Sequence, residues 1–305
     1  MVRSEMSTEA SLHEPTVQAL PREALAALQA ERLAALLHRA GSTAGSRYVG
    51  VGATLAAHAP LTGAALADEV EAHPPFGRFR LDQAALIRAG LATAAVPRPT
   101  PIAWTRADLD REASLGARAL RRVGLAPRGR SSDCLDGGLV TPGTLAVSDA
   151  LDALDALALP VGPVVNDAAL QRAAEVWEIV RPEVLIVDAP SLAFLQRAPA
   201  SPPARAFAVL LTPDDATELA APARPDVCRI FSLPQVCTFA AGECAARDGF
   251  HLAEDAVLAE VVDGRLLLTA LTRGLALLRF DTGLHAALDR SPCACGETHA
   301  RLRFA

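Results

Sequence analysis

The sequence predicts an α/β protein with a mostly parallel sheet, followed by a strand-rich C-terminal part. Apolar runs that suit buried strands alternate with stretches that suit helices, and this alternation is typical of a parallel sheet flanked by helices. The strands are expected at 159–165, 184–187 and 206–211. One helix is expected before the first strand, at 144–157, and one between the first two strands, at 168–180. Beyond Cys228 the helical stretches stop. The further strands are expected at 229–233, 258–262, 265–269 and 277–280.

Composition sets the limits of what the chain can be. With 305 residues, 51% of them hydrophobic, the chain can bury one large core or the cores of two subdomains. No apolar run approaches the roughly 20 residues that a membrane span needs, and the polar first 15 residues do not resemble a secretory signal. Six scattered cysteines predict thiols or metal ligands in a reducing, cytoplasmic compartment.

Charge excludes two classes of function. The net charge of −6 and the pI near 5.7 give no electrostatic reason to expect a nucleic-acid partner. All 29 basic residues are arginine, so the chain alone cannot use a lysine ammonium or a lysine Schiff base.

Local signals place the first elements. Residues 1–17 are expected to form a disordered leader, and 18–104 a helical N-terminal part that begins at Leu20-Pro21-Arg22-Glu23. The proline-rich stretch 96–101 is expected to be an extended linker. Thr105, with Asp108 three residues later, predicts the N-cap of a helix that runs to about Val123.

Two further subdomains follow. Residues 105–227 are expected to form the α/β part, in which Asn166 caps the helix at 168–180. Residues 228–305 are expected to form the strand-rich part, where Asp263-Gly264 is typical of a hairpin turn.

The last quarter of the chain gathers metal-ligand residues. Cys244 and His251 precede the expected hairpin at 258–269, and Cys293 and Cys295 follow it. Three thiolates and one imidazole suit zinc, and four protein ligands close the coordination sphere as in structural sites. His299 is an alternative ligand or a residue that orients one. The alternatives are a mixture of buried cysteines and surface histidines, or a disulfide.

Several segments, in order and spacing, resemble one known family. The matching segments are Leu20–Glu23, Pro75–Gly77, Trp104–Leu109, Arg181–Leu185, Glu243–His251, Leu268–Thr272 and Cys293–His299. From Leu20 to its end the chain resembles phenylacetate–CoA ligases of the adenylate-forming acyl-CoA synthetase superfamily. The resemblance implies the large N-terminal domain of such a ligase, without the small C-terminal lid domain and its lysine.

The residues that would serve ATP depart from the pattern of this family. The stretch that matches its phosphate loop, 93–99, lacks glycine and most hydroxyls, and prolines remove backbone donors. Gln235 stands where the family has a magnesium-side glutamate, and a neutral amide lacks the charge that a hard cation prefers. The segment 211–214 replaces a Gly-Gly-Glu-Pro turn, and Leu284 replaces the ribose-binding aspartate. We therefore expect neither ATP nor magnesium.

The resemblance places an acyl pocket beside the loop 131–143. Candidate catalytic residues there are Asp133, Cys134 and Asp136. The candidate substrate-binding residues are Gly137, Gly138, Thr141, Phe231, Gln235 and Cys237. A lone cysteine is commonly a small buried hydrophobe, and neighbouring carboxylates raise the pKa of a thiol. Acid/base chemistry by an aspartate is therefore favoured over a cysteine nucleophile.

Three hypotheses about function remain open. The chain is an enzyme that processes an already activated acyl or aryl thioester of CoA or a carrier protein, by hydrolysis, cyclisation or dehydration in a specialised pathway. Alternatively, it is a non-catalytic pseudoenzyme that binds a carrier protein or a ligase. In the third hypothesis, another chain supplies the lid and its lysine. The sequence also leaves assembly as a homo-oligomer open.

Overall fold

A computed structural model describes residues 12–81, 85–137, 140–141, 143–198 and 204–305. The helices are α1 (Pro15–Gln18), α2 (Arg22–Ser42), α3 (Gly63–Ala72), α4 (Arg106–Val123), α5 (Thr144–Asp152), α6 (Asp167–Val180), α7 (Ala189–Leu195) and α8 (Ala216–Ala220), with short 3₁₀ turns η2 (Leu55–Ala57) and η3 (Pro213–Asp215). The strands are β1 (Arg88–Ala92), β2 (Thr100–Trp104), β3 (Arg130–Asp133), β4 (Val140–Thr141), β5 (Leu157–Pro160), β6 (Val184–Val187), β7 (Ala206–Leu211), β8 (Val227–Leu233), β9 (Cys237–Glu243), β10 (Phe250–Leu252), β11 (Val257–Val262), β12 (Arg265–Ala270), β13 (Phe280–Asp289) and β14 (Arg301–Phe304).

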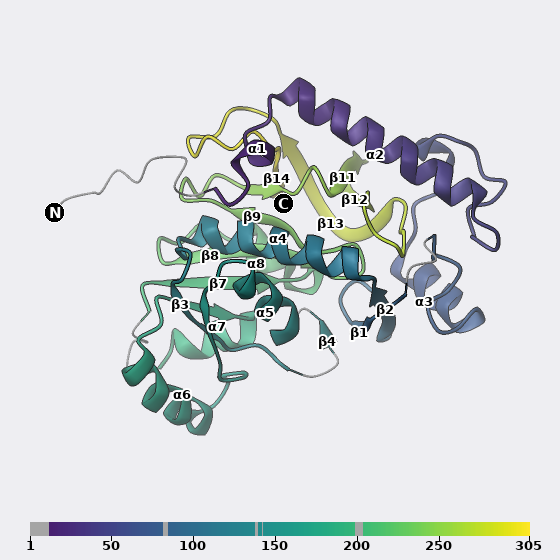
Figure 1. The fold of residues 1–305 in the computed structure, drawn as a ribbon. Helices are drawn as coiled ribbons and strands as arrows, with labels where there is room; N and C mark the ends of the chain where they lie inside the picture. Colours follow the sequence, from purple (N-terminus) through teal and green to yellow (C-terminus); the bar gives the residue numbers. More distant parts are fainter. Residues whose placement is uncertain (1–11, 82–84, 138–139, 142, 199–203) are drawn as a thin grey trace.

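One sheet of 11 strands runs through the molecule, in the order β11-β12-β13-β14-β10-β9-β8-β7-β6-β3-β5. Strands β5, β3, β6, β7 and β8 pair in parallel, and from β8 onward the neighbours are antiparallel. The predicted α/β class and strand-rich C-terminal part are confirmed. The sheet is continuous across the expected boundary between residues 227 and 228, because β8 pairs with strands of both parts (Figure 1).

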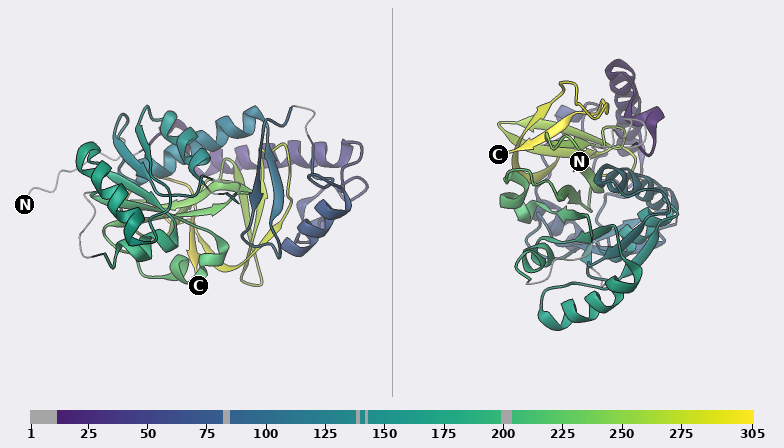
Figure 2. Two further views of the ribbon diagram at one scale, coloured as in Figure 1. Left: turned by 90° about the horizontal axis from the view of Figure 1, so that it is seen from below. Right: turned by 90° about the vertical axis from the view of Figure 1, so that its left-hand side faces the viewer.

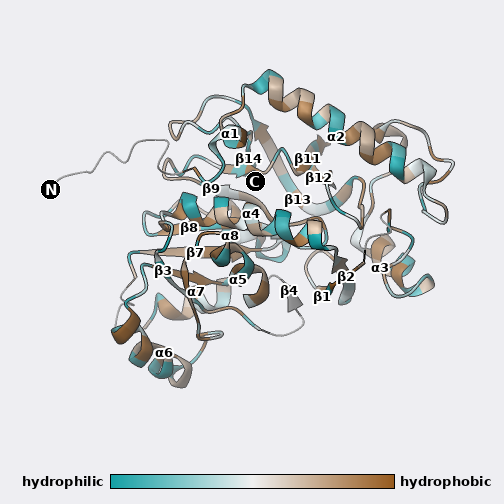
Figure 3. Ribbon diagram, viewed as in Figure 1, coloured by the Kyte–Doolittle hydropathy of each residue, from teal (hydrophilic) through white to brown (hydrophobic). Residues whose placement is uncertain are grey.

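Helices cover the two halves of this sheet differently. Helix α4 packs against β7, β9 and α5, and the helices of residues 106–195 gather around the parallel half (Figure 2). Helix α2 lies beside the antiparallel half, where the Gln29 amide donates to the Glu254 carbonyl at 2.8 Å. Hydrophilic and hydrophobic residues are interleaved along α2, as expected for a helix with one buried face (Figure 3). No helix within the described ranges is long and apolar enough to cross a membrane.

Local capping signals predicted several boundaries. The Thr105 side chain accepts the Asp108 N–H, and the Asp108 side chain accepts the Thr105 N–H, so both halves of a capping box are formed at α4. The helix ends at Val123, as predicted. Asn166 caps α6, and Asp263 and Gly264 both have positive φ in the turn between β11 and β12.

Three expectations about local structure were wrong: an all-helical N-terminal part at 18–104, a linker at 96–101 and a strand at 277–280. The N-terminal part contains the hairpin β1–β2, and Pro101 lies in its edge strand opposite Leu91, where a missing N–H is tolerated. The predicted strand at 277–280 does not form, because the Tyr48 hydroxyl accepts the Leu278 N–H and Arg279 has a φ of 51°. The strand β13 begins only at Phe280.

The expected disordered leader needs correction for the residues that the structure describes. Residues 15–18 form α1, and Gln18 at its end is completely buried. The Glu14 carboxylate accepts a hydrogen bond from Ser114 at 2.7 Å and pairs with the buried Arg118. The remainder of the predicted leader, residues 1–11, lies outside the described residues. The order at 12–17 depends on long-range partners, which a polar sequence does not reveal.

Candidate active site and metal centre

The carboxyl ends of the parallel strands place two of the predicted site residues, Asp133 and Gln235, at one edge of the sheet. β3 ends at Asp133, β7 is followed by Asp214, and β8 is followed by Gln235. Ligands in open α/β sheets bind outside the carboxyl ends of the strands. Strand β4 pairs with β1 and thereby holds the end of the loop 131–143 beside the hairpin loop 93–99.

Asp133 has the electrostatic properties of an acid/base group. It is 1% exposed, and its side chain accepts the Leu135 N–H at 2.9 Å. Burial raises the pKa of Asp133 to about 6, although hydrogen bonds with Leu135 and Thr144 oppose the shift. A carboxyl group that exchanges its proton near neutral pH is suited to general acid/base catalysis.

Cys134 is unsuited to nucleophilic attack. It belongs to the hydrophobic core, with no exposed surface, and its backbone N–H donates to the Ile186 carbonyl at 2.8 Å. Burial, followed by the nearby charges of Asp133 and Asp188, raises the pKa of the thiol to about 12. The thiol therefore stays neutral at physiological pH, whereas attack requires the thiolate.

The rest of the loop is only partly described. Asp136 and Gly137 are exposed, and the Asp136 carbonyl accepts the Thr144 N–H at 3.1 Å. Gly138 lies outside the described residues, and Thr141 is described only as a strand residue opposite Ala92. The candidate residues that can be placed by their side chains in this loop are therefore Asp133, Cys134 and Asp136.

Phe231, in β8, and Cys237, at the start of β9, lie in the core. The Phe231 ring is fully buried and packs edge-on against Phe304, with ring centroids 5.1 Å apart. Cys237 lines a small cavity with Glu112 and Arg273, and burial followed by the Glu112 charge raises the pKa of its thiol. About 10 Å³ of this cavity is open to the centre of a water molecule, which is room for about one water.

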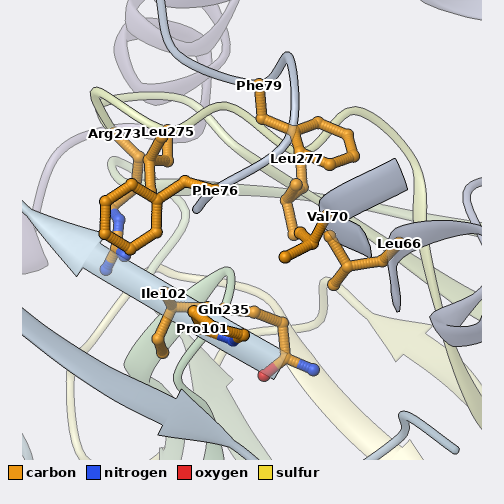
Figure 4. A pocket seen from close by; sticks show the side chains of 10 residues that line it. All are labelled: Leu66, Val70, Phe76, Phe79, Pro101, Ile102, Gln235, Arg273, Leu275 and Leu277. Carbon is orange, nitrogen blue, oxygen red and sulfur yellow. The ribbon is translucent and has the colours of Figure 1, made fainter. Parts of the chain in front are cut away.

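Gln235 reaches the hairpin loop and a second small cavity. Its Nε2 donates to the Ala94 carbonyl at 3.0 Å. The cavity has apolar walls from α3, β2 and the segments 76–79 and 275–277, with Gln235 and Arg273 as its polar lining residues (Figure 4). It also leaves only about 10 Å³ for water centres. Gln235 thus holds a loop, and the space beside it admits about one water.

The four predicted metal ligands do come together. The donor atoms of Cys244, His251, Cys293 and Cys295 all lie within 4.8 Å of one another. The Cys244 and Cys293 sulfurs are 3.7 Å apart, and the Cys295 sulfur is 3.3 Å from His251 Nε2. Ligand atoms around a tetrahedral zinc, with bonds of about 2.0–2.3 Å, are separated by about 3.3–3.8 Å. The spacing and the donor set therefore fit zinc, and the six cysteines form no disulfide in the structure.

Neighbouring groups orient these ligands. His251 Nδ1 lies 3.1 Å from the His299 carbonyl, which leaves Nε2 free to face the other ligands. A hydrogen bond from the Cys295 thiol lowers the pKa of Cys244, and the same bond raises the pKa of Cys295. The two ring nitrogens of His299 lie near the Leu252 and Val17 carbonyls. His299 is therefore a residue that orients a ligand and not an alternative ligand.

Comparisons with known proteins agree with this architecture. No protein-family model matches the chain. A phenylacetate-coenzyme A ligase of Thermus thermophilus is 28% identical over an alignment of 331 residues in length. The alignment covers 95% of this chain and 72% of the relative. An open conformation of 2-hydroxyisobutyryl-CoA ligase, in complex with 2-HIB-AMP and CoA, superimposes with a TM-score of 0.81 at 17% identity, covering 99% of this chain and 78% of that one. The same ligase in its postadenylation state gives 0.79, with 99% and 71% covered.

The chain is therefore similar in sequence to a phenylacetate–CoA ligase and in fold to an acyl-CoA ligase of the adenylate-forming type. Its fold is that of the large N-terminal domain of these ligases, as the sequence segments predicted. The hairpin loop 93–99 lies between β1 and β2, at the place where the resemblance puts the phosphate loop of an adenylate-forming enzyme.

Polar groups of this loop are bound by side chains of the same protein. The Ala95 N–H donates to the Asp214 carboxylate at 3.2 Å, and the Ala94 carbonyl accepts from Gln235. Ala95 itself has a φ of 57°, in the left-handed region. The sequence indicated that 211–214 and Gln235 depart from the adenylate-forming pattern, but not that Asp214 contacts the loop. Such a contact across about 120 residues has no local signal.

Proposed function

We propose that this chain does not adenylate its substrate and instead acts on an acyl or aryl thioester that is already activated. The Asp214 carboxylate at the Ala95 N–H is the observation that carries this proposal. Phosphate loops bind triphosphates through backbone N–H groups, so a carboxylate on such a group both occupies a donor and repels an anion. The neutral Gln235 amide also offers magnesium no charge.

Asp133 is the group that we assign to the chemistry. Its pKa of about 6 lets it accept a proton from a nucleophile and return it to a leaving thiolate. In thioester hydrolysis, water attacks the carbonyl carbon, the C–S bond breaks, and the proton passes through the carboxyl group to sulfur. Cyclisation requires the same proton transfers, with a nucleophile of the substrate itself in place of water. In dehydration, the carboxylate would take a proton from carbon and return it to the leaving hydroxyl, so that the C–O bond breaks as a C=C bond forms. A CoA thioester is the substrate class that the names of the relatives support.

A binding role without catalysis is the second candidate. The buried thiols of Cys134 and Cys237 have raised pKa values, and the cavities beside Gln235 and Cys237 admit about one water each. These observations suit a scaffold that docks onto a carrier protein or a ligase. The two candidates differ in whether a thioester is consumed. The third hypothesis, a subunit completed by another chain, leaves the Asp214 contact with the loop without a purpose.

We also propose that Cys244, His251, Cys293 and Cys295 hold a structural zinc ion. The four protein ligands fill a tetrahedral sphere and leave no position for a substrate or an activated water. The ion would join the end of β9, β10 and the segment between β13 and β14.

Thiol release from phenylacetyl-CoA, followed with a thiol reagent and without ATP, tests the enzymatic proposal. We expect turnover that falls by about 100-fold or more in Asp133→Asn, because a positioned acid/base group contributes at least that much. Asp152→Asn, at the exposed end of α5, is the matched control and should keep full turnover. Pyrophosphate release from ATP and phenylacetate would refute the loss of adenylation. Thioesters that bind but are never consumed would favour the scaffold.

A further inference from the structure

The residues between the start of the described chain and α2 form a strap that is folded onto the C-terminal part. Within this strap, residues 13–22, the Gln18 side chain accepts the N–H groups of His13 and Glu14, both at 2.9 Å. These bonds close the strap into one turn around a buried amide. A segment of this length has no core of its own, so its order depends on what it contacts.

The middle of the strap is bound by the segment that supplies two of the metal ligands. Thr298, three residues after Cys295, donates its N–H to the Gln18 carbonyl at 3.0 Å and its hydroxyl to the Leu20 carbonyl at 2.6 Å. His299 Nε2 lies 3.2 Å from the Val17 carbonyl. Three carbonyl groups of the strap, those of Val17, Gln18 and Leu20, are therefore tied to Thr298 and His299, which lie three and four residues after the last metal ligand.

The metal-ligand segment has little regular structure to hold it in place. Residues 290–300 lie between β13 and β14, and Gly296 there has a φ of 82°. The middle of the segment is fixed by the ligand positions of Cys293 and Cys295 and by the ion pair of Glu297 with Arg122 of α4. Its end is fixed by hydrogen bonds of Ala300 with Glu254 and Leu252. Without a cation, the close approach of the cysteines loses its main attraction, and the anchor at Cys293 and Cys295 is lost.

The ends of the strap have anchors that do not involve the metal. Glu14 accepts from Ser114 and pairs with Arg118 of α4. At the other end, Arg22 pairs with Glu254 and also donates to the Thr298 carbonyl at 3.2 Å. The strap is thus built from a middle that depends on the metal-ligand segment and two ends that depend on ion pairs.

We propose that the metal centre fastens this strap, so that loss of the metal releases residues 13–20 while the parallel half of the sheet stays folded. The inference rests on the proposed zinc site. Metal content would then control whether the surface under the strap, which includes Thr298 and His299, is covered.

Hydrogen–deuterium exchange on the purified chain, with and without a chelator, tests the inference. Peptides covering 13–21 are expected to exchange about 10-fold faster or more after metal removal, because local opening becomes easier. Peptides from β6 and β7 should keep their rates within about two-fold. Zinc content is measured on the same samples by elemental analysis, so the metal and the strap are scored separately.

Two variants separate the strap from the metal. Thr298→Val removes the hydroxyl bond to Leu20 and should speed exchange in 13–21 while one zinc per chain is retained. Thr217→Val, at an exposed position of α8, is the matched control and should change neither quantity. If hydrogen exchange in the strap is unchanged after verified zinc loss, the inference about the strap is overturned, but the proposal of a zinc site still stands. A chain that never binds zinc, with a protected strap, would overturn both.

Discussion

Replacing Asp133 by asparagine is expected to stabilise the protein at neutral pH and not in acid. The pKa of Asp133 is raised from 3.8 to about 6, so folding favours the neutral carboxyl group. Each pKa unit corresponds to about 1.4 kcal/mol, and the ionised form at pH 7.5 therefore costs about 3 kcal/mol of stability. Asparagine removes that cost and can still accept the Leu135 N–H.

The sign of the pH dependence follows from the raised pKa. Well below pH 3.8 the carboxyl group is protonated in both states and costs nothing, and the cost grows as the pH rises from 3.8 to about 6 and then levels off. We expect the stability advantage of Asp133→Asn over the natural chain to be about 2–3 kcal/mol larger at pH 7.5 than at pH 4.

Thermal unfolding at both pH values measures this difference. Since 1 kcal/mol moves the melting temperature of a chain of this size by about 2 °C, the gap between variant and natural chain should be about 4–6 °C larger at pH 7.5. Asp152→Asn, at the exposed end of α5, should shift stability by less than about 0.5 kcal/mol at either pH. A gap for Asp133→Asn that does not vary with pH would refute the reasoning.

Metal removal should lower the melting temperature sharply and added zinc should restore it, since structural zinc contributes on the order of 10 kcal/mol in small domains. Calorimetry with and without a chelator measures this change. An unchanged transition would exclude a structural ion. Asp255→Asn should cost about 3–5 kcal/mol because it leaves the Arg118 guanidinium buried without its bidentate partner. Arg78→Gln, at an exposed pair, should cost much less than Asp255→Asn, and equal costs of the two variants in denaturant titrations would contradict the assignment. Thr105→Ala should cost about 1 kcal/mol by removing the capping box of α4, visible as a lower midpoint at constant slope.

The elements that the sequence predicted well carry their signals within a few residues. The capping box at Thr105, the Asn166 cap and the Asp263-Gly264 turn each satisfy backbone groups locally. The expectations that failed depend on distant partners. The Tyr48 hydroxyl, 230 residues away, takes the Leu278 N–H that a strand would have used. Pro101 is compatible with β2 only because β2 is the edge of its sheet.

The same distinction applies to the site. The four metal ligands were predictable because zinc restricts its donors to a few side-chain types, and three cysteines with one histidine are conspicuous in this composition. The Asp214 contact was not predictable, since an aspartate after a strand is ordinary and its target lies on another hairpin. The shifted pKa of Asp133 also required the structure, because burial by the surrounding core causes it.

The cost of Asp133 bears on the choice between an enzyme and a scaffold. A scaffold would be more stable at neutral pH with a neutral side chain at this position, by about 3 kcal/mol on the figures above. Buried groups with strongly shifted pKa values concentrate at functional sites, where the lost stability accompanies a chemical role. Asp133 lies at the carboxyl edge of β3, at the site position of an open α/β sheet. If Asp133→Asn both stabilises the chain and abolishes thioester turnover, the stability cost is the cost of catalysis. If it stabilises the chain and changes no measurable activity, the burial of this carboxyl group serves no reaction, and the scaffold is the better description.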